Sequence, residues 1–318
     1  MARGGKTMNF SLVGNYPEKH AASLKKKIAG WLSVESDQVV VGNGSDQIVD
    51  LIAKVFLGQK VTCLVQVPTF FRIIDVVRQS HAKLITVSTI EDNFCLKTEK
   101  LIKRLNPQVV WLCSPNNPTG ETIDSRFIAR IAKKTKGLVI VDEAYQEIFD
   151  PQNKFSAVRL IKRHKNVLVT KSFSKAFDLA EIRVGMAIAH KNIAGALEKN
   201  QLNFPISMAS QQTAEKALDD IKSLKNVHRY FEKERKFLFS NIDKLSNLER
   251  CGNSKTNIFI LRHKRLNLFD LLLKENIETA DFNKMNGLES QGFVRITIKN
   301  HPENIQLLNT LQKVSAKI

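Results

Sequence analysis

An apolar stretch, VVWLC (109–113), runs directly into SPNNPTG (114–120) near the middle of the chain. The apolar stretch is rich in β-prone residues and is typical of a buried strand. Asn, Pro and Gly are turn residues, so SPNNPTG predicts a loop at the end of that strand. The loop is either a simple turn or a means of presenting Asn117 to a ligand, because open α/β sheets bind ligands at the carboxyl ends of their strands.

Segments that read as strands and helices alternate through the first two thirds of the chain. Apolar runs predict the strands, and apolar residues at helical spacing predict the helices between them. The predicted strands are 38–44, 61–68, 83–88, 109–113, 137–145, 166–175 and 183–190, and the predicted helices are 45–57, 69–81, 98–105 and 125–135. This alternation indicates βαβ units, so we expect an α/β fold with a mostly parallel central sheet flanked by helices.

The pattern changes near residue 208. Long amphipathic helical segments are followed by strand-like TNIFILR (256–262) and FVRITI (293–298), and then by a final helical segment. Such a mixture is typical of a smaller α+β unit beside a large sheet. We therefore expect an N-terminal arm at 1–30, a large domain at 31–207 and a small C-terminal domain at 208–318.

Composition limits the class of protein. The chain has 318 residues, 43% of them hydrophobic, which is enough for a full core. No run approaches the roughly 20 apolar residues of a membrane span, and the N-terminal residues lack the apolar core of a secretory signal. The cysteines show no CxxC spacing, so we expect a reduced, cytoplasmic protein without a cysteine metal site and without a membrane partner. They are Cys63, Cys95, Cys113 and Cys251.

The formal net charge of +18 could serve nucleic-acid binding. The basic residues are spread along the whole chain, however, and aromatic residues make up only 7% of it. We therefore expect a basic surface that favours anionic substrates and cofactors, and we do not expect a nucleic-acid partner.

Polar residues follow several of the predicted strands. GNGSD (42–46) places Ser45 and Asp46 at the start of a helix, where free N–H groups suit a phosphate, although such residues also serve as simple caps. Asp142 follows the apolar run LVIV, and Tyr145 comes three residues later. A carboxylate at the end of a buried strand is costly unless it has a partner, so Asp142 is a candidate functional residue.

The stretch VTKSFSKAFDLAEIRVG (169–185) adds hydroxyls, a lysine and an arginine at another strand end. Hydroxyls with an arginine are phosphate-binding chemistry, and a lysine in such a place can form a Schiff base. With Asp142 these groups match the needs of pyridoxal phosphate (PLP), which takes a lysine and an acidic partner for its ring nitrogen. The residues in question are Ser172, Ser174, Lys175 and Arg183.

Several motifs together resemble the fold-type I PLP-dependent enzymes, specifically class I and II aminotransferases near histidinol-phosphate aminotransferase. They occur in the family's order over residues 16–298, and they are YP (16–17), VGNGSDQIVDLI, VPTFF, CSPNNPTG, VIVDEAY, SFSKAFDLAEIRVG and FVRITI. The resemblance implies an aminotransferase that moves an amino group between an amino acid or amine, phosphorylated or not, and a 2-oxo acid.

The resemblance also implies roles for individual residues. Lys175 would bind PLP covalently and move a proton, and Asp142 would pair with the ring nitrogen. Asn117 and Tyr145 would bind the 3-oxygen of the ring, and Phe70 would stack on the ring, unless it is a plain core residue. The phosphate would be bound by the backbone N–H groups of Ser45 and Asp46 and by the side chains of Ser172, Ser174 and Arg183.

Two further residues are implied at the edges of the site. Tyr16 would reach the phosphate of a neighbouring subunit, which implies a homodimer, unless Tyr16 is an ordinary turn residue. Arg295 would bind the substrate carboxylate beside Asn117, unless it is an exposed charge on a strand.

Two departures from the family pattern bear on the substrate. The segment before Tyr16 is shorter than in relatives. Relatives that act on phosphorylated substrates usually carry an Arg where this chain has Ala280. A second anion clamp is therefore missing, or it comes from Arg3, Lys284 or another residue.

Two alternatives stay open. The C-terminal stretch and the RGG at 3–5 also resemble PLP-dependent decarboxylases of threonine-phosphate or serine-phosphate type. The other alternative is a nucleic-acid-binding protein that retains this fold, which the charge suggests and Lys175 with Asp142 argue against.

Overall fold

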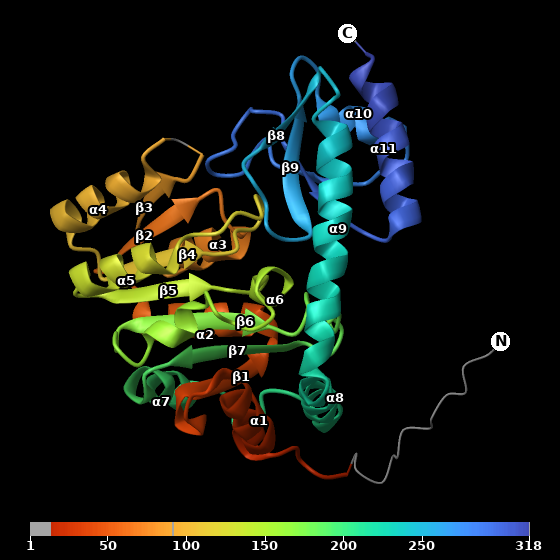
Figure 1. The fold of residues 1–318 in the computed structure, drawn as a ribbon. Helices are drawn as coiled ribbons and strands as arrows, with labels where there is room; N and C mark the ends of the chain where they lie inside the picture. The colour runs from red at the N-terminus through yellow and green to blue at the C-terminus, as the bar shows by residue number, and fades with distance from the viewer. Residues whose placement is uncertain (1–13, 91, 318) are drawn as a thin grey trace.

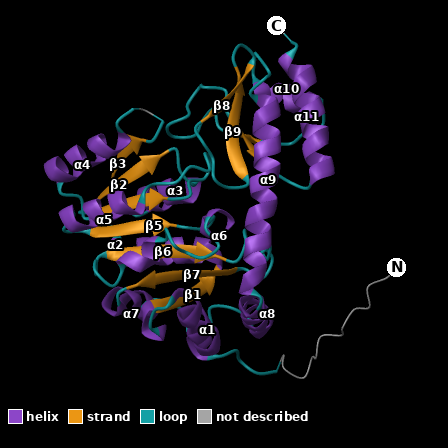
Figure 2. Ribbon diagram, viewed as in Figure 1, coloured by secondary structure: helices purple, strands orange, loops and turns teal. Residues whose placement is uncertain are grey.

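A computed structural model describes residues 14–90 and 92–317, and its large sheet has seven strands (Figures 1 and 2). In spatial order these are β1 (Val39–Asn43), β7 (Val184–Ala189), β6 (Val167–Ser172), β5 (Leu138–Asp142), β4 (Val109–Cys113), β2 (Thr62–Val67) and β3 (Lys83–Ser88). Strand β7 is antiparallel to both neighbours, and the other pairs are parallel. The expected mostly parallel sheet is thus confirmed.

Helices cover both faces of this sheet (Figure 1). Strand β4 shows why, because Val110 and Leu112 enter one core while Trp111 and Cys113 enter the other. A strand that is buried on both faces reads as a continuous apolar run, as VVWLC does. The α-helices that precede the small sheet in the chain are α1 (Ala22–Leu32), α2 (Gly44–Phe56), α3 (Phe71–Gln79), α4 (Phe94–Leu105), α5 (Ser125–Lys134), α6 (Gln146–Phe149), α7 (Lys191–Lys199), α8 (Met208–Asp219) and α9 (Leu224–Ile242).

A second, antiparallel sheet of four strands lies beside the first. Helix α9 runs alongside both units (Figure 1). A separate core joins the second sheet to its helices through residues such as Leu238, Phe259 and Leu311. The strands in spatial order are β10 (Ala280–Asp281), β11 (Val294–Thr297), β9 (Ile258–His263) and β8 (Leu248–Cys251), and the helices are α10 (Leu268–Lys274) and α11 (His301–Ser315).

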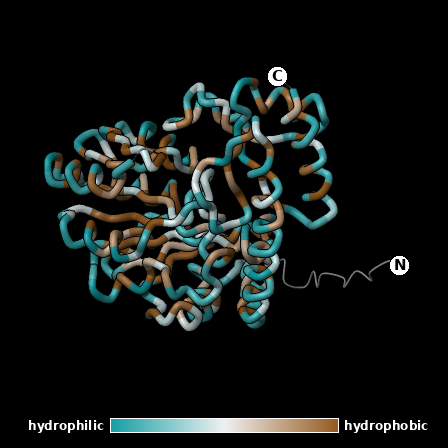
Figure 3. The backbone as a smooth tube through the Cα atoms, turned by 45° about the horizontal axis from the view of Figure 1, so that its top comes forward, coloured by the Kyte–Doolittle hydropathy of each residue, from teal (hydrophilic) through white to brown (hydrophobic). Residues whose placement is uncertain are grey.

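Hydrophobic residues are concentrated along the strands of the large sheet, whereas hydrophobic and hydrophilic residues alternate along the helices (Figure 3). Helix α1 packs Leu24 and Ile28 into the core of this sheet. The division at residues 30/31 and 207/208 stays a prediction. Within the described residues, no helix is long and apolar enough to cross a bilayer.

Candidate active site

A cavity of about 160 Å³ lies at the carboxyl ends of the parallel strands. Its walls come from the segments that follow β1, β2, β4, β5 and β6, which are far apart in sequence. The structure therefore brings together residues that the sequence analysis identified at separate strand ends. The predicted residues that line this cavity are Ser45, Asp46, Phe70, Asn117, Asp142, Tyr145, Ser172, Ser174, Lys175 and Arg183.

Asp142 is the last residue of β5, and only 3% of it is exposed. Its Oδ1 accepts hydrogen bonds from Thr170 Oγ1 at 2.9 Å and from the Ala144 N–H at 3.2 Å. Oδ2 has no hydrogen-bond partner among the described residues, so one oxygen is left to accept from a bound group. Burial raises the pKa of Asp142 to about 6. A protonated ring nitrogen fits this position, because it would supply both a positive charge and the missing donor.

Lys175 follows β6 and extends along the same cavity. Its Nζ lies 5.3 Å from the centre of the Tyr145 ring. Burial, and then the positive charge of Arg295, lower the pKa of Lys175. A lowered pKa makes the neutral amine more accessible, which is the form that attacks a carbonyl. Burial also raises the pKa of Tyr145 to about 12, so its hydroxyl keeps its proton near neutral pH and can donate a hydrogen bond.

The start of α2 forms a cradle for an anion. No side chain caps this helix at Asn43, and beyond Gly44, whose N–H donates to a backbone carbonyl, the N–H groups of Ser45 and Asp46 have no hydrogen-bond partner among the described residues. Gly44 has a φ of +74°, and a Cβ there would lie 2.4 Å from Arg183 Nη2. A Cβ on Gly185 would lie 2.2 Å from the Ser45 nitrogen. Both glycines thus keep the guanidinium and the helix N-terminus close together, as a phosphate requires.

Hydrogen bonds to the first residues of α2 also hold Arg183 in place. Its Nη2 donates to Asp46 Oδ2 at 2.8 Å, and the backbone carbonyl of Arg183 accepts from the Gly44 N–H at 2.8 Å. Ser172 Oγ accepts from the Ser174 N–H at 3.1 Å, which fixes the second wall of the cradle. The predicted phosphate-binding residues therefore lie together in the cavity.

The loop at 114–120 is both a turn and a support for Asn117. Asn116 Nδ2 donates to the Pro68 carbonyl at 2.9 Å, and the Gly120 N–H donates to the Asn116 carbonyl at 2.7 Å. The Ser114–Pro115 and Asn117–Pro118 peptide bonds are cis. These contacts hold Asn117 in the wall of the cavity.

Arg295 reaches the site from the small sheet. Its Nη1 donates to Asn117 Oδ1 at 2.9 Å, although the two residues are 178 positions apart. The Nε of Arg295 is buried and has no hydrogen-bond partner among the described residues. Ala280 is its neighbour across the β10–β11 pair, so no second guanidinium stands at that position. Arg295 is therefore a half-buried cation beside the cavity, and its Nε–H can still donate a hydrogen bond.

Two other positions lie away from the cavity. Tyr16 is 81% exposed and stacks on Phe204, with ring centres 4.9 Å apart. Lys284 lines a different cavity together with Arg78. Arg3 lies outside the described residues.

A buried ion cluster behind the site was missed by the sequence analysis. Lys171 in β6 has no exposed surface, and its Nζ lies 2.9 Å from Glu143 Oε2 and 2.7 Å from Glu147 Oε1. It also donates to Asn153 Oδ1 at 2.8 Å. Lys171 and Glu143 are each adjacent in sequence to a residue of the cavity wall, namely Ser172 and Asp142. The cluster therefore ties together the ends of β5 and β6 that carry the site.

The raised pKa of Asp142 predicts how stability depends on pH in the ligand-free protein. The folded state takes up a proton near pH 6, whereas the unfolded chain does so near 3.8, so Asp142 lowers stability above pH 6 and this cost disappears as the pH falls towards 4. The shift corresponds to about 3 kcal/mol. Asp142→Asn should therefore gain stability over the native protein above pH 6, with a difference that shrinks at lower pH. Urea unfolding at several pH values measures it, and a pH-independent difference would contradict the prediction.

This chain is similar in sequence to known aminotransferases along most of its length. The family model for aminotransferase class I and II matches residues 6–311. The histidinol-phosphate aminotransferase of Thermoanaerobacter sp. (strain X514) is 34% identical over 308 residues, which are 96% of this chain and 85% of that protein. That of Methanosphaera stadtmanae is 27% identical and covers 95% of this chain and 83% of its own.

Solved structures give the same fold. The histidinol-phosphate aminotransferase of Clostridium acetobutylicum superposes with a TM-score of 0.88 at 25% identity, covering 97% of this chain and 93% of that one. L-threonine-O-3-phosphate decarboxylase from Porphyromonas gingivalis superposes with a TM-score of 0.84 at 23% identity, covering 96% and 94%. The second likeness shows the fold alone.

Proposed function

Because this chain belongs to the family of class I and II aminotransferases, we propose that Lys175 binds its PLP and moves the proton during amino-group transfer. The enzyme is a PLP-dependent transaminase. The observation that carries the proposal is a lysine of lowered pKa, in one cavity with a buried carboxylate and an anion cradle. When bound, PLP supplies the carbonyl carbon that takes up the amino group and a ring that withdraws electrons.

The other residues of the cavity orient that group. Asp142 offers Oδ2 to the ring nitrogen and keeps a positive charge there, because its own burial is costly without a cationic partner. Asn117 and the Tyr145 hydroxyl bind the 3-oxygen, and Phe70 covers one face of the ring. The phosphate is held at the start of α2 by Ser45 and Asp46 through their N–H groups and by the side chains of Ser172, Ser174 and Arg183.

Arg295 is proposed to bind the anionic group of the substrate. Its guanidinium is held on Asn117 and keeps the buried Nε for a further acceptor. With Ala280 beside it, the substrate anion is held by one arginine. The donor is thus an amine or amino acid with a single anionic group that reaches Arg295. It is of the histidinol-phosphate kind that the relatives' names state, and the acceptor is a 2-oxo acid.

The absorption spectrum during a half-reaction tests this function. The enzyme is mixed with histidinol phosphate in the absence of any 2-oxo acid. We expect the visible band of lysine-bound PLP to fall, to stay low, and to return when 2-oxoglutarate is added. Recovery without an oxo acid, with carbon dioxide released from threonine phosphate, would instead show a decarboxylase. No spectral change with histidinol phosphate would refute the proposed donor.

Replacing Arg295 with methionine should weaken the enzyme for anionic donors. Charge-assisted hydrogen bonds contribute about 1.5–3 kcal/mol each, so kcat/KM should fall by about 10- to 100-fold or more. In the PLP-free protein the pKa of the Lys175 amine should also rise, because Arg295 lowers it in the native protein. Steady-state kinetics measure the first effect, and the pH dependence of the rate at which the PLP-free protein takes up PLP measures the second. Arg262→Met, which removes an arginine that pairs with Glu249 on β8, is the matched control.

We also propose that the enzyme is a cytoplasmic homodimer. Tyr16 is exposed together with Leu202 and Phe204, which forms an apolar surface suited to a partner subunit. In the dimer Tyr16 would reach the phosphate of the other subunit. Sedimentation should give about twice the chain mass of 36.0 kDa, and Tyr16→Ala should loosen PLP. A monomer with full activity would refute this arrangement.

A further inference from the structure

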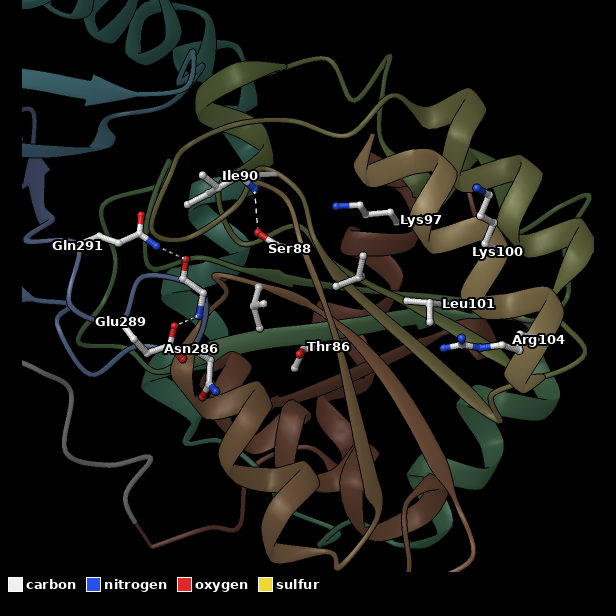
Figure 4. A pocket seen from close by; sticks show the side chains of 13 residues that line it. Thr86, Ser88, Ile90, Lys97, Lys100, Leu101, Arg104, Asn286, Glu289 and Gln291 are labelled. Carbon is white, nitrogen blue, oxygen red and sulfur yellow. Dashed lines mark hydrogen bonds between the residues drawn. The ribbon is translucent and has the colours of Figure 1, made fainter. Parts of the chain in front are cut away.

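A second cavity, of about 810 Å³, lies beside β3, the strand at one edge of the large sheet (Figure 4). Its walls are helix α4, the end of strand β3 and the loop at 286–291 between β10 and β11. None of the residues proposed to act in catalysis lines it. Its volume falls within the range of small-molecule sites.

The wall formed by α4 is positively charged. Lys97, Lys100 and Arg104 line the cavity and follow one another at helical spacing, so they share one face of α4. Figure 4 shows the side chains of Lys97 and Arg104 extending from α4 towards the cavity. Among the residues that the structure describes, neither Lys100 nor Arg104 has a hydrogen bond or ion pair with another side chain.

The described walls of the cavity carry little negative charge. Among the described lining residues Glu289 is the acidic one, and one of its oxygens already accepts from the Gly287 N–H at 2.8 Å. Cations therefore outnumber carboxylates along the described walls. This imbalance favours an anion over a cation or a neutral ligand.

The floor of the cavity is apolar, and its edge offers backbone groups. Val87, Ile90 and Leu101 supply the apolar surface. Strand β3 is at the end of the seven-stranded sheet, and the consecutive residues 86–88 all line the cavity, so the outer edge of the strand faces it. An edge strand presents N–H and C=O groups that have no neighbouring strand. A ligand with both an anionic group and an apolar body fits these walls.

We propose that this cavity binds a small anionic molecule of up to nucleotide size, in which a phosphate or sulfonate is joined to an apolar body. The anion lies against Lys100 and Arg104, and the apolar body lies over Val87, Ile90 and Leu101. The site is separate from the catalytic cavity and independent of the proposed function.

The proposal also connects the cavity with the catalytic site. The backbone of Gly287 packs so closely on Pro68 that a Cβ would lie 2.9 Å from the Pro68 nitrogen. Phe70 of the catalytic cavity follows two residues later, and Arg295 follows the far end of the same loop. A ligand in the second cavity would therefore contact a loop that continues into β11, the strand that carries Arg295.

The test measures binding of two probes, adenosine monophosphate and anilinonaphthalene sulfonate, to the PLP-loaded enzyme. The variant Lys100→Glu/Arg104→Glu reverses the charge of the cavity wall. Lys103→Glu/Lys133→Glu makes the same change in net charge at exposed positions of α4 and α5 outside the cavity. Both variants should keep the visible spectrum of bound PLP, which shows that they are folded.

We expect at least one probe to bind the native enzyme and the control variant alike, with a Kd at least tenfold higher in Lys100→Glu/Arg104→Glu. Inorganic phosphate should bind more weakly than adenosine monophosphate, because it lacks the apolar body. The proposal is overturned if neither probe binds, or if the two variants lose binding equally, since equal loss would indicate attraction by net charge alone.

Discussion

Replacing Lys175 with alanine should abolish transamination and remove the visible absorption of lysine-bound PLP. Proton transfer by a positioned side chain contributes about 10²- to 10⁴-fold, and the covalent link to the cofactor is lost as well, so kcat should fall by at least about 10³-fold. Lys175 is the lysine that lines the catalytic cavity, and its pKa is already lowered there. Steady-state kinetics and the spectrum of the purified variant measure the loss.

Chemical rescue separates catalysis by Lys175 from a structural effect. A small primary amine such as methylamine fits the space left by the side chain and can carry the proton, so it should restore part of the activity of Lys175→Ala. Lys162→Ala is the matched control, because Lys162 is exposed and away from the cavity. Retention of the visible band by Lys175→Ala would assign the covalent link to another lysine.

Local sequence patterns predicted the large sheet well. The run VVWLC became β4, buried on both faces, and the apolar run before Asp142 became β5. The predicted strand at 166–175 was too long, because β6 ends at Ser172 and Ser174 and Lys175 lie in the turn that forms the cavity wall. The strand ends where the side chains of Ser174 and Lys175 turn towards the cavity. The alternation of apolar and polar residues, which predicts a strand, does not show where the chain turns.

Contacts between segments that are distant in the chain could not be predicted from local sequence patterns. Thr170 lies opposite Asp142 only through the register of β5 and β6, which no local pattern determines. The bond from Arg295 to Asn117 depends on how the small sheet packs against the large one. The resemblance implied that both residues serve the substrate, and the structure adds that each holds the other.

Lys171 shows a different limit of sequence reasoning. In VTKSFSK a lysine on a strand reads as a solvated charge, yet this side chain is fully buried. Its carboxylate partners are Glu143, the residue that follows β5, and Glu147 in α6. No local sequence pattern pairs Lys171 with either of them. Burial by itself disfavours the charged form of Lys171, but Glu143 and Glu147 outweigh this effect and raise its pKa.

Replacing Lys171 with methionine should therefore destabilise the protein severely. Removal of one partner from a buried ion pair costs about 3–5 kcal/mol, because the remaining charge stays buried without compensation. Here two carboxylates would be left, of which Glu147 already has a pKa raised by burial. Urea unfolding at pH 7.5 measures the loss in free energy of unfolding, and Lys171→Arg, which keeps the charge, should lose much less.

The dependence on pH and a compensating variant make this test specific. Without Lys171, burial favours the protonated form of Glu147 still more in the folded state, so the variant should recover part of its stability relative to the native protein as the pH falls. The triple variant Lys171→Met/Glu143→Gln/Glu147→Gln, which removes all three charges, should be more stable than Lys171→Met alone. If the triple variant is instead the less stable, uncompensated charge is not the cause. Since the cluster joins the ends of β5 and β6, Lys171→Met should also release PLP faster than Lys171→Arg, which links the stability of this buried cluster to the geometry of Asp142 and Lys175.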